Sequence, residues 1–229
     1  MSQQNDALAR IRQILENKSA AKQITYRNLL MAFDKLAAES KRIINNLQTE
    51  ANDRAADVTV DFIEVNEHEF QVKLAGDLLI FVLHTNIVTF DETHAVMAHP
   101  YLKENEINRY FGQIMVYNFM SDSIRYNRVN DPGYLVARIL INHENRFLVE
   151  GEGRLGFLFK QISLTPIESK DLNSIVQHAL TTAIENDLMA PPFPQVRFIT
   201  LHQKMEKTSE LGAGQKIGFR MNYENKING

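Results

Sequence analysis

Arginine is the side chain best suited to bidentate contact with a carboxylate or a phosphate. Residues 109–160 contain a single lysine, Lys160, but six arginines: Arg109, Arg125, Arg128, Arg138, Arg146 and Arg154. If the stretch forms antiparallel strands joined by short turns, directly opposed residues share a face of the sheet. The turn lengths then predict a row across four strands, made of Arg125, Arg138, Glu150 and Arg154. Two opposed arginines repel each other unless an anion lies between them, so Arg125, Arg138 and Arg154 form a candidate anion-binding site.

An ordinary charged surface, in which Glu150 bridges two arginines, is the alternative interpretation of this row. Three turns must have the expected lengths, and a slip of one residue in any of them moves the side chains to the other face. Tyr134, Val136 and Leu140 are expected on the same face as Arg138. A site there would be partly shielded from water, which strengthens contacts with an anion.

Asp61, Gln71 and Lys73 form the second candidate site. Some metal-dependent nucleases place an aspartate and a (Glu/Gln)-x-Lys pair on adjacent strands, where the carboxylate holds Mg²⁺ and the lysine stabilises charge at the scissile phosphate. Gln71 and Lys73 are two residues apart and therefore share one face of a strand. Glutamine is a weaker metal ligand than glutamate, and solvent-facing polar residues on two strands would have the same pattern. With Glu64 as a further ligand candidate, the alternative function is a Mg²⁺-dependent phosphodiesterase.

The remaining motifs do not complete a catalytic set. Residues 151–156 match G-x-G-x-x-G, but a dinucleotide-binding fingerprint opens a helix after a strand, and we expect residues 157–159 to continue as a strand. We therefore interpret the glycines as hairpin turns. Four histidines fit no metal-ligand spacing and are interpreted as surface residues: His68, His84, His94 and His99. No cofactor or metal is predicted, and an enzyme is the less favoured class.

Composition restricts the function further. The chain has 229 residues, a formal net charge of −3 and no cysteine. The chain therefore has no overall positive charge that would attract nucleic acid. The absence of cysteine excludes disulfides, zinc–thiolate sites and thiol nucleophiles. The N-terminal residues are polar, and the longest apolar run, residues 78–83, is too short to cross a bilayer. These features predict a cytoplasmic protein without a membrane or nucleic-acid partner.

Residues 1–52 are predicted as a helical segment. Within it, apolar residues recur in alternating steps of four and three, the pattern of helices that pack on one another. This heptad seam consists of Tyr26, Leu30, Phe33, Ala37, Ser40, Ile44 and Leu47. Leu29, Leu36 and Ile43 flank the seam and are expected to pack on a sheet. Because one helix would then have two apolar faces, we predict a homodimer whose interface includes residues 24–47. A shorter preceding helix, folded back over the seam within one chain, is the alternative.

From about residue 57 the apolar period changes to two, which indicates half-buried strands. Consecutive strands separated by short turns imply an antiparallel meander. The expected strands cover 58–62, 70–74, 78–83, 110–120, 123–129, 134–142, 146–150, 155–162 and 196–201, with a further one at 217–221. Residues 165–168 resemble a capping box with proline at the first helical position, which predicts a helix over 166–187.

The predicted fold is α+β, with a large antiparallel meander β-sheet packed against the long N-terminal helical segment and one helix in the C-terminal half. Residues 1–52 and 53–203 belong to one domain, and residues 204–229 form a polar tail. The sequence predicts a non-enzymatic binding or regulatory protein that recognises an anionic ligand or an acidic partner through the arginine-bearing sheet face. The phosphodiesterase is the alternative function, and a structural assembly protein is the second alternative.

Overall fold

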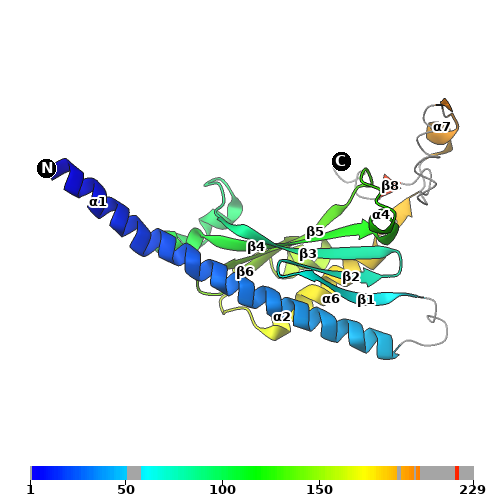
Figure 1. Cartoon of the computed structure of the whole chain (residues 1–229), viewed down its shortest axis with the longest axis horizontal. Coiled ribbons are helices and arrows are strands. Elements are labelled where there is room, and N and C mark those ends of the chain that lie inside the picture. The colour runs from blue at the N-terminus through cyan, green and yellow to red at the C-terminus, as the bar shows by residue number, and fades with distance from the viewer. Residues whose placement is uncertain (1, 51–57, 190–191, 199, 202–219, 222–229) are drawn as a thin grey trace.

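The computed structural model describes residues 2–50, 58–189, 192–198, 200–201 and 220–221 (Figure 1). Its helices are α1 (Ser2–Ile14), the π-helical turn η1 (Leu15–Ser19), α2 (Ala20–Glu50), the 3-10 helix η3 (Ala95–Ala98), α3 (Pro100–Glu104), the 3-10 helix η4 (Glu106–Arg109), α4 (Ser121–Arg125), α5 (Gly153–Leu158), α6 (Ser169–Glu185) and α7 (Phe193–Val196). Its strands are β1 (Val60–Asn66), β2 (Glu69–Leu74), β3 (Asp77–Val88), β4 (Phe111–Met120), β5 (Tyr134–Asn142), β6 (Phe147–Gly151), β7 (Leu188–Met189) and β8 (Arg220–Met221).

The predicted α+β fold is confirmed. Strands β1 to β6 form one antiparallel sheet in sequence order, so each strand pairs with the next one along the chain, even across the longer connections that carry η3, α3, η4 and α4. Two tight turns use residues with positive φ, Ala75 between β2 and β3 and Asn145 between β5 and β6. Register shifts interrupt the ladder near Glu64 in β1 and between Val116 and Tyr117 in β4. The second shift decides which side chains of β5 share a face.

The N-terminal helical segment is one continuous helix, with the π-helical turn between α1 and α2. α2 runs along the sheet, whereas α1 projects from the domain (Figure 1). The ammonium groups of Lys18 and Lys22 lie 5.4 Å and 5.0 Å from the centre of the Tyr110 ring, where the helix leaves the sheet. The helix does not fold back, so the alternative in which a first helix covers the heptad seam is wrong.

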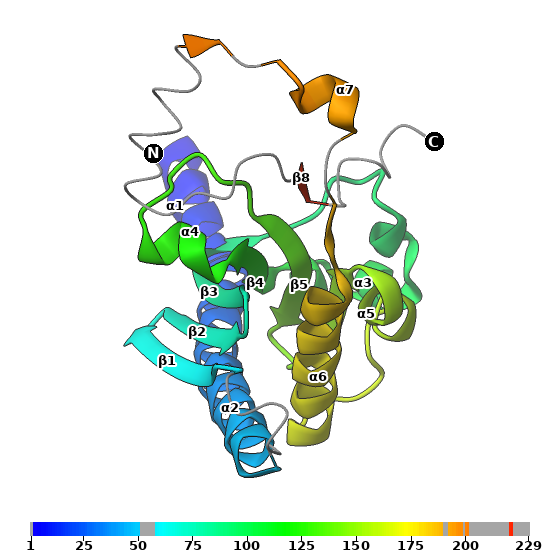
Figure 2. The same ribbon diagram turned by 90° about the vertical axis from the view of Figure 1, so that its right-hand side faces the viewer.

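The main core lies between one face of the sheet and the two long helices, α2 and α6 (Figure 2). α2 contributes Leu29, Leu36 and Ile43 as predicted, and the sheet contributes alternate residues such as Val72 and Phe81. The apolar residues of α6 recur in steps of three and four, so one stripe of the helix is buried. This side of the sheet is called the helix face below.

The opposite side of the sheet, called the outer face below, has a smaller core. Phe111, Leu140 and Leu148 pack there against the segment that carries η3 and α3, through Met97 and Leu102. Alternate residues of β2, β3 and β4 on the outer face stay half-buried: Lys73, Ile80, Val82, Met115 and Tyr117. The outer face is therefore covered at its β5–β6 end and accessible over β2 to β4.

In four places the local structure differs from the prediction, in three strands by its kind and in one helix only by its bounds. The expected strand over 123–129 is instead α4 followed by a loop, and the one over 155–162 begins as α5. In the former, buried Arg128 forms an ion pair with Asp131, and in the latter Leu155 turns into the core. The helix expected from residue 166 begins at Ser169, with Glu168 and Asp171 forming the capping box.

The fourth concerns the strand expected over 196–201. α7 ends at Val196, and the described residues after it are not in a strand; residue 199 lies outside the described part of the chain. The predicted polar tail, 204–229, and the strand over 217–221 also lie outside it, except for Arg220 and Met221 in β8.

Candidate functional site

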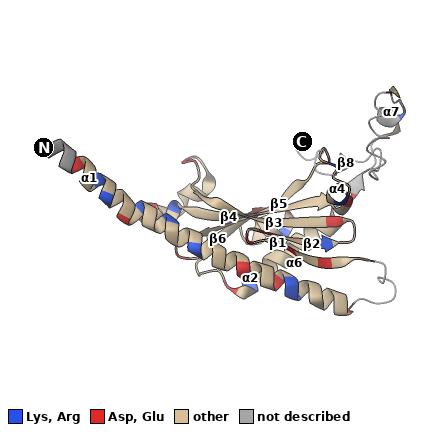
Figure 3. Cartoon of the chain, viewed as in Figure 1, with Lys and Arg blue, Asp and Glu red and all other residues tan. Residues whose placement is uncertain are grey.

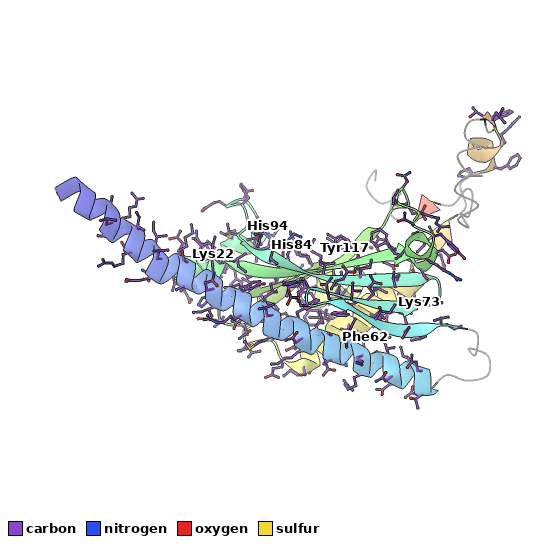
Figure 4. The ribbon with its side chains drawn as sticks, viewed as in Figure 1. Lys22, Phe62, Lys73, His84, His94 and Tyr117 are labelled. Atoms are coloured by element: carbon purple, nitrogen blue, oxygen red, sulfur yellow. The ribbon has the colours of Figure 1, made fainter. Side chains whose placement is uncertain are left out.

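An apolar strip crosses the accessible part of the outer face. Ile80 of β3 pairs with Tyr117 of β4, and Val82 pairs with Met115, so these four side chains are neighbours on one face. The strip lies between Lys73 on β2 and His84 near the far end of β3 (Figure 4). The structure thus places a lysine ammonium group beyond one end of a half-buried apolar surface and an imidazole beyond the other.

Lys73, His84 and the hydroxyl group of Tyr117 have no hydrogen-bond or ion-pair partner among the residues that the structure describes. Lys73 is half-buried, and its cross-strand neighbours are Asp61 and Leu78. A partly desolvated ammonium group that forms no direct ion pair favours a nearby anion, because its charge is screened less than that of a fully exposed lysine. These three groups could contact one bound ligand or partner surface.

Part of the predicted arginine row is present. Arg138 and Glu150 are directly paired between β5 and β6, as the turn at 143–145 predicted. Arg138 donates from Nε and from Nη2 to the same Glu150 oxygen, Oε2. The carboxylate therefore occupies the position that an external anion would need, and Arg138 is held by the protein itself.

His94 extends this pair. Its Nε2 lies 3.3 Å from Glu150 Oε1, while its Nδ1 accepts a hydrogen bond from the backbone N–H of Val96. The His94 ring stacks on Phe90 with ring centres 4.3 Å apart, and the Arg138 guanidinium lies 5.7 Å from the Phe90 ring centre. The cluster fastens the start of the η3 segment to the outer face, which is a structural role.

The other two predicted arginines do not join Arg138. Arg125 is exposed at the end of α4, with its guanidinium 5.2 Å from the Tyr126 ring centre. Arg154 is exposed in α5 and lines a depression beside α6, on the helix face of the sheet. A three-arginine anion site is therefore not assembled, because both outer positions of the row belong to helices rather than strands.

Two residues expected beside Arg138 lie on the opposite face. Tyr134 and Val136 are buried in the main core under the helices, whereas Leu140 does share the outer face with Arg138. The cause is the register shift in β4–β5, where Val116 pairs with Ala137 and Tyr117 pairs with Leu135. Such a bulge moves the preceding residues of the strand to the other side of the sheet.

Asp61, Gln71 and Lys73 do share the outer face, as the alternative enzyme requires. Asp61 is directly opposite Lys73 on β1 and β2, although no ion pair forms between them. Gln71 Nε2 donates to Glu69 Oε1 at 2.7 Å, and Glu64 points to the other face, where it pairs with Lys41. In the described part of the chain, no group of three histidine, aspartate or glutamate side chains could hold a metal ion.

The heptad seam packs within a single chain. Phe33 and Ile44 are buried in the main core, and Tyr26, Leu30 and Ala37 are half-buried against it. Leu47, near the end of α2, keeps 43% of its surface exposed. The described residues therefore use most of the seam to hold α2 on the sheet. Whether the chain also self-associates stays a prediction.

A buried polar cluster at the β5–β6 turn had no counterpart in the sequence analysis. Asn142 Oδ1 accepts from the backbone N–H groups of Glu144 and Arg146, and Asn142 Nδ2 donates to the Tyr101 hydroxyl at 2.7 Å. Tyr101 in turn donates to Glu144 Oε2, and burial raises the pKa of Tyr101 to about 12. Burial lowers the pKa of His143, whose Nε2 lies 2.9 Å from Asn108 Oδ1. These polar side chains form hydrogen bonds with one another and with the backbone, so the cluster holds the β5–β6 turn in place.

The glycine motif does open a helix after a strand, contrary to the prediction, since α5 follows β6 directly. A Cβ on Gly156 would lie 2.2 Å from the carbonyl oxygen of Gly151, so glycine is required for this close approach. A dinucleotide-binding unit also needs a parallel strand after the helix, and this sheet is antiparallel. Gly156 therefore serves packing, whereas Gly153 adopts a positive φ of +56° at the start of α5.

A further depression, the β1–α2 groove, lies between α2 and the β1–β2 hairpin. It has a volume of about 600 Å³, and Phe33, Phe62 and Ala37 supply its apolar lining. Asp34 and Glu67 also line it. Sequence reasoning missed it, because the groove depends on the angle at which the helix crosses the edge of the sheet.

Comparisons with known proteins identify no relative: no protein-family model, curated protein or solved structure gives a significant match to this chain.

Among the described residues, no helix combines the length and the apolar character needed to span a bilayer. In the view of Figure 3, acidic and basic residues are interspersed along α1 and α2.

Proposed function

We propose that this chain is a non-enzymatic binding protein that recognises an anionic group, on a small ligand or an acidic partner, through the outer face of its sheet. The observation that carries the proposal is the half-buried Lys73 without a partner among the described residues, beside the apolar strip of Ile80, Val82, Met115 and Tyr117. This proposal keeps the predicted class of function and moves the binding side chains from the arginine row to Lys73, Tyr117 and His84.

The surface has the composition of a binding site. Ligand sites combine an apolar lining with a small number of polar groups that fix orientation. Here the apolar part is rigid, because all four residues of the strip sit on paired strands of one sheet. Lys73 would supply the charge and the Tyr117 hydroxyl a hydrogen bond. Arg138 is neutralised by Glu150 and would contribute little to anion binding.

A thermal-shift panel of inorganic phosphate, nucleotides and dicarboxylates tests the small-ligand form of the proposal, because a ligand that binds only the folded state raises the melting temperature. Lys73→Glu should abolish the response. Lys160→Glu makes the same charge change at an exposed position away from the strip and should leave it intact. Equal responses in the two variants would contradict the proposal.

The second candidate function is the Mg²⁺-dependent phosphodiesterase, favoured by the direct opposition of Asp61 and Lys73 on one face. With Asp61 as the carboxylate beside Lys73, Mg²⁺ would bind together with the substrate phosphate, because such ions are usually held by one or two carboxylates plus substrate phosphates. Cleavage of a generic phosphodiester such as bis(p-nitrophenyl) phosphate with Mg²⁺ tests it. Activity that persists unchanged in Lys73→Ala would rule this function out.

A further inference from the structure

The two edges of the sheet differ. At the β6 edge, the backbone N–H of Val149 donates to the carbonyl of Phe159, and Phe147 exchanges hydrogen bonds with Ser163 through its N–H and its carbonyl. Residues that follow β6 thus cover that edge. At the β1 edge no described strand or loop pairs with the backbone. An uncovered edge is a template for pairing with another chain.

The ladder shows which groups of β1 point outward. Ala75 N–H donates to the carbonyl of Thr59, and in an antiparallel pair such bonding recurs at every second residue, so Asp61 and Ile63 also face β2. The backbone groups of Val60, Phe62 and Glu64 therefore point away from the sheet.

Side chains of the same molecule form hydrogen bonds only with the outward-pointing backbone groups nearest the start of β1. Gln48 Nε2 donates to the carbonyl of Val60 at 2.8 Å, and Asp61 Oδ1 accepts from the N–H of Phe62 at 2.9 Å. Outside the sheet ladder, no described residue forms a hydrogen bond with the carbonyl of Phe62 or with either backbone group of Glu64. The open part of the edge is therefore the part of β1 that lies nearer to the β1–β2 turn.

The β1–α2 groove lies directly beside the open part, because Phe62 and Glu64 belong to its lining. Figure 4 shows Phe62 beside α2, and Lys41 of α2 holds its ammonium group 5.7 Å from the Phe62 ring centre. The groove therefore already accommodates one lysine over an aromatic ring. Four carboxylates and one lysine are among its lining residues: Asp34, Glu64, Glu67, Glu69 and Lys41.

We propose that the β1 edge and the adjacent groove bind an extended, lysine- or arginine-rich segment of a partner protein, which adds a strand to the sheet next to β1. Backbone hydrogen bonds to Phe62 and Glu64 provide the affinity, and alternate side chains of the added strand enter the groove. Basic side chains at these positions meet Asp34 and the other carboxylates of the groove. This surface is separate from the outer face, so it does not depend on the proposed anion recognition.

Charge distinguishes this partner from a second copy of the chain. If two β1 strands paired with each other, two acidic grooves would approach across the twofold axis. Like charges brought together at an interface oppose association, whereas a basic segment is attracted by the same groove. The geometry thus points to a basic partner rather than to a homodimer through this edge.

The probe is a fluorescein-labelled peptide of about nine residues with alternating valine and lysine, measured by fluorescence polarisation against the full chain. A matched peptide with alternating valine and glutamate should bind about tenfold more weakly, because its charge is reversed. A third peptide, with N-methyl groups on alternate amides of the valine–lysine sequence, cannot donate along the edge and should also lose about tenfold in affinity.

Two pairs of protein variants complete the test. Glu64→Pro removes the outward N–H without disturbing the ladder to β2, since proline is tolerated on edge strands, and should weaken the valine–lysine probe about fivefold. Glu64→Gln keeps the N–H and is its control. Asp34→Lys should weaken the probe about threefold, whereas the same change at exposed Glu16, far along the N-terminal helix, should not.

The proposal is overturned if the N-methylated peptide binds as well as the parent, because strand addition requires those amides. That comparison uses the unaltered protein, so it stands even where a variant unfolds. Equal binding of the lysine and glutamate peptides, or no binding of either, would also overturn it. A dimer by light scattering that becomes a monomer in Glu64→Pro would show that the edge belongs to a second copy.

Discussion

Arg138 and Glu150 lie directly opposite each other on β5 and β6, and Glu150 Oε2 accepts hydrogen bonds from both Nε and Nη2 of Arg138. The other oxygen of the carboxylate lies 3.3 Å from His94 Nε2. One glutamate thus neutralises the arginine of the outer face and anchors the start of the η3 segment. Removing its charge should affect both the stability of the fold and the affinity of the face for anions.

Glu150→Gln should lower the free energy of unfolding by about 1 kcal/mol, since the ion pair is partly exposed. The same change frees Arg138, so phosphate should stabilise the variant more than it stabilises the original chain. Urea denaturation with and without phosphate measures both effects. Glu185→Gln, an exposed position on α6, is the control and should change neither.

Asn142→Ala should destabilise the fold by about 2–4 kcal/mol, because each buried polar group left without a partner costs about 1–3 kcal/mol. The backbone N–H groups of Glu144 and Arg146 lose their acceptor, and the Tyr101 hydroxyl loses a donor. Chemical denaturation checks the value. Asn130→Ala, at an exposed position, should stay within about 0.5 kcal/mol of the original chain.

Gly156→Ala should cost about 2 kcal/mol or more, since its Cβ would meet the rigid carbonyl oxygen of Gly151 at 2.2 Å. Gly76 offers a matched control, because a Cβ there meets nothing within 4 Å. Gly76→Ala should leave stability unchanged or raise it slightly. Melting temperatures of the two variants decide the point, and similar losses in both would contradict the packing role of α5.

The free energy of unfolding should fall as the pH drops below about 6.5. Burial lowers the pKa of His143 in the folded chain from its ordinary value of 6.5. Between the two values the unfolded chain binds the proton more readily, so stability rises with pH across this window and is fully present above 6.5. Urea titrations at several pH values measure the slope. His143→Gln should flatten it, and an unchanged slope would show that another group is responsible.

Phe33→Ala should destabilise the single chain by about 3–5 kcal/mol, because the structure places this seam residue in the core. Leu15→Ala should change stability by less than about 0.5 kcal/mol, since Leu15 is 58% exposed in the projecting part of the helix. Denaturation of both variants at one low concentration measures the difference. A small effect of Phe33→Ala would favour the original interpretation of the seam as a contact between chains.

The long helix and the first two strands could be predicted because each has one dominant period, and the third because it is a short continuous apolar run. Alternation in β2 at Phe70, Val72 and Leu74 matches the burial of those residues on the helix face. The heptad seam was equally clear, but its period does not reveal whether a helix or a sheet lies opposite. Phe33 and Ile44 therefore suggested a second chain where the structure has the chain's own strands.

The failures have different causes. Arg128 and Asp131 are only three residues apart, and their ion pair, which period counting does not detect, closes the loop after α4. Leu155 belongs to a short apolar run that suits a strand or a helix equally, and its burial under α6 depends on tertiary packing. The side on which Tyr134 lies depends on one bulge, which has no local signal.

The coverage of the β6 edge by residues 159–163 limits what the chain can assemble into. Open-ended polymerisation through sheets needs two complementary edges on every subunit, one to receive and one to donate. Within the described six-stranded sheet only the β1 edge can accept a strand, so this sheet can terminate growth but cannot propagate it. Association at this edge should therefore stop at a stoichiometry of one to one, and high concentration should produce discrete complexes rather than fibres.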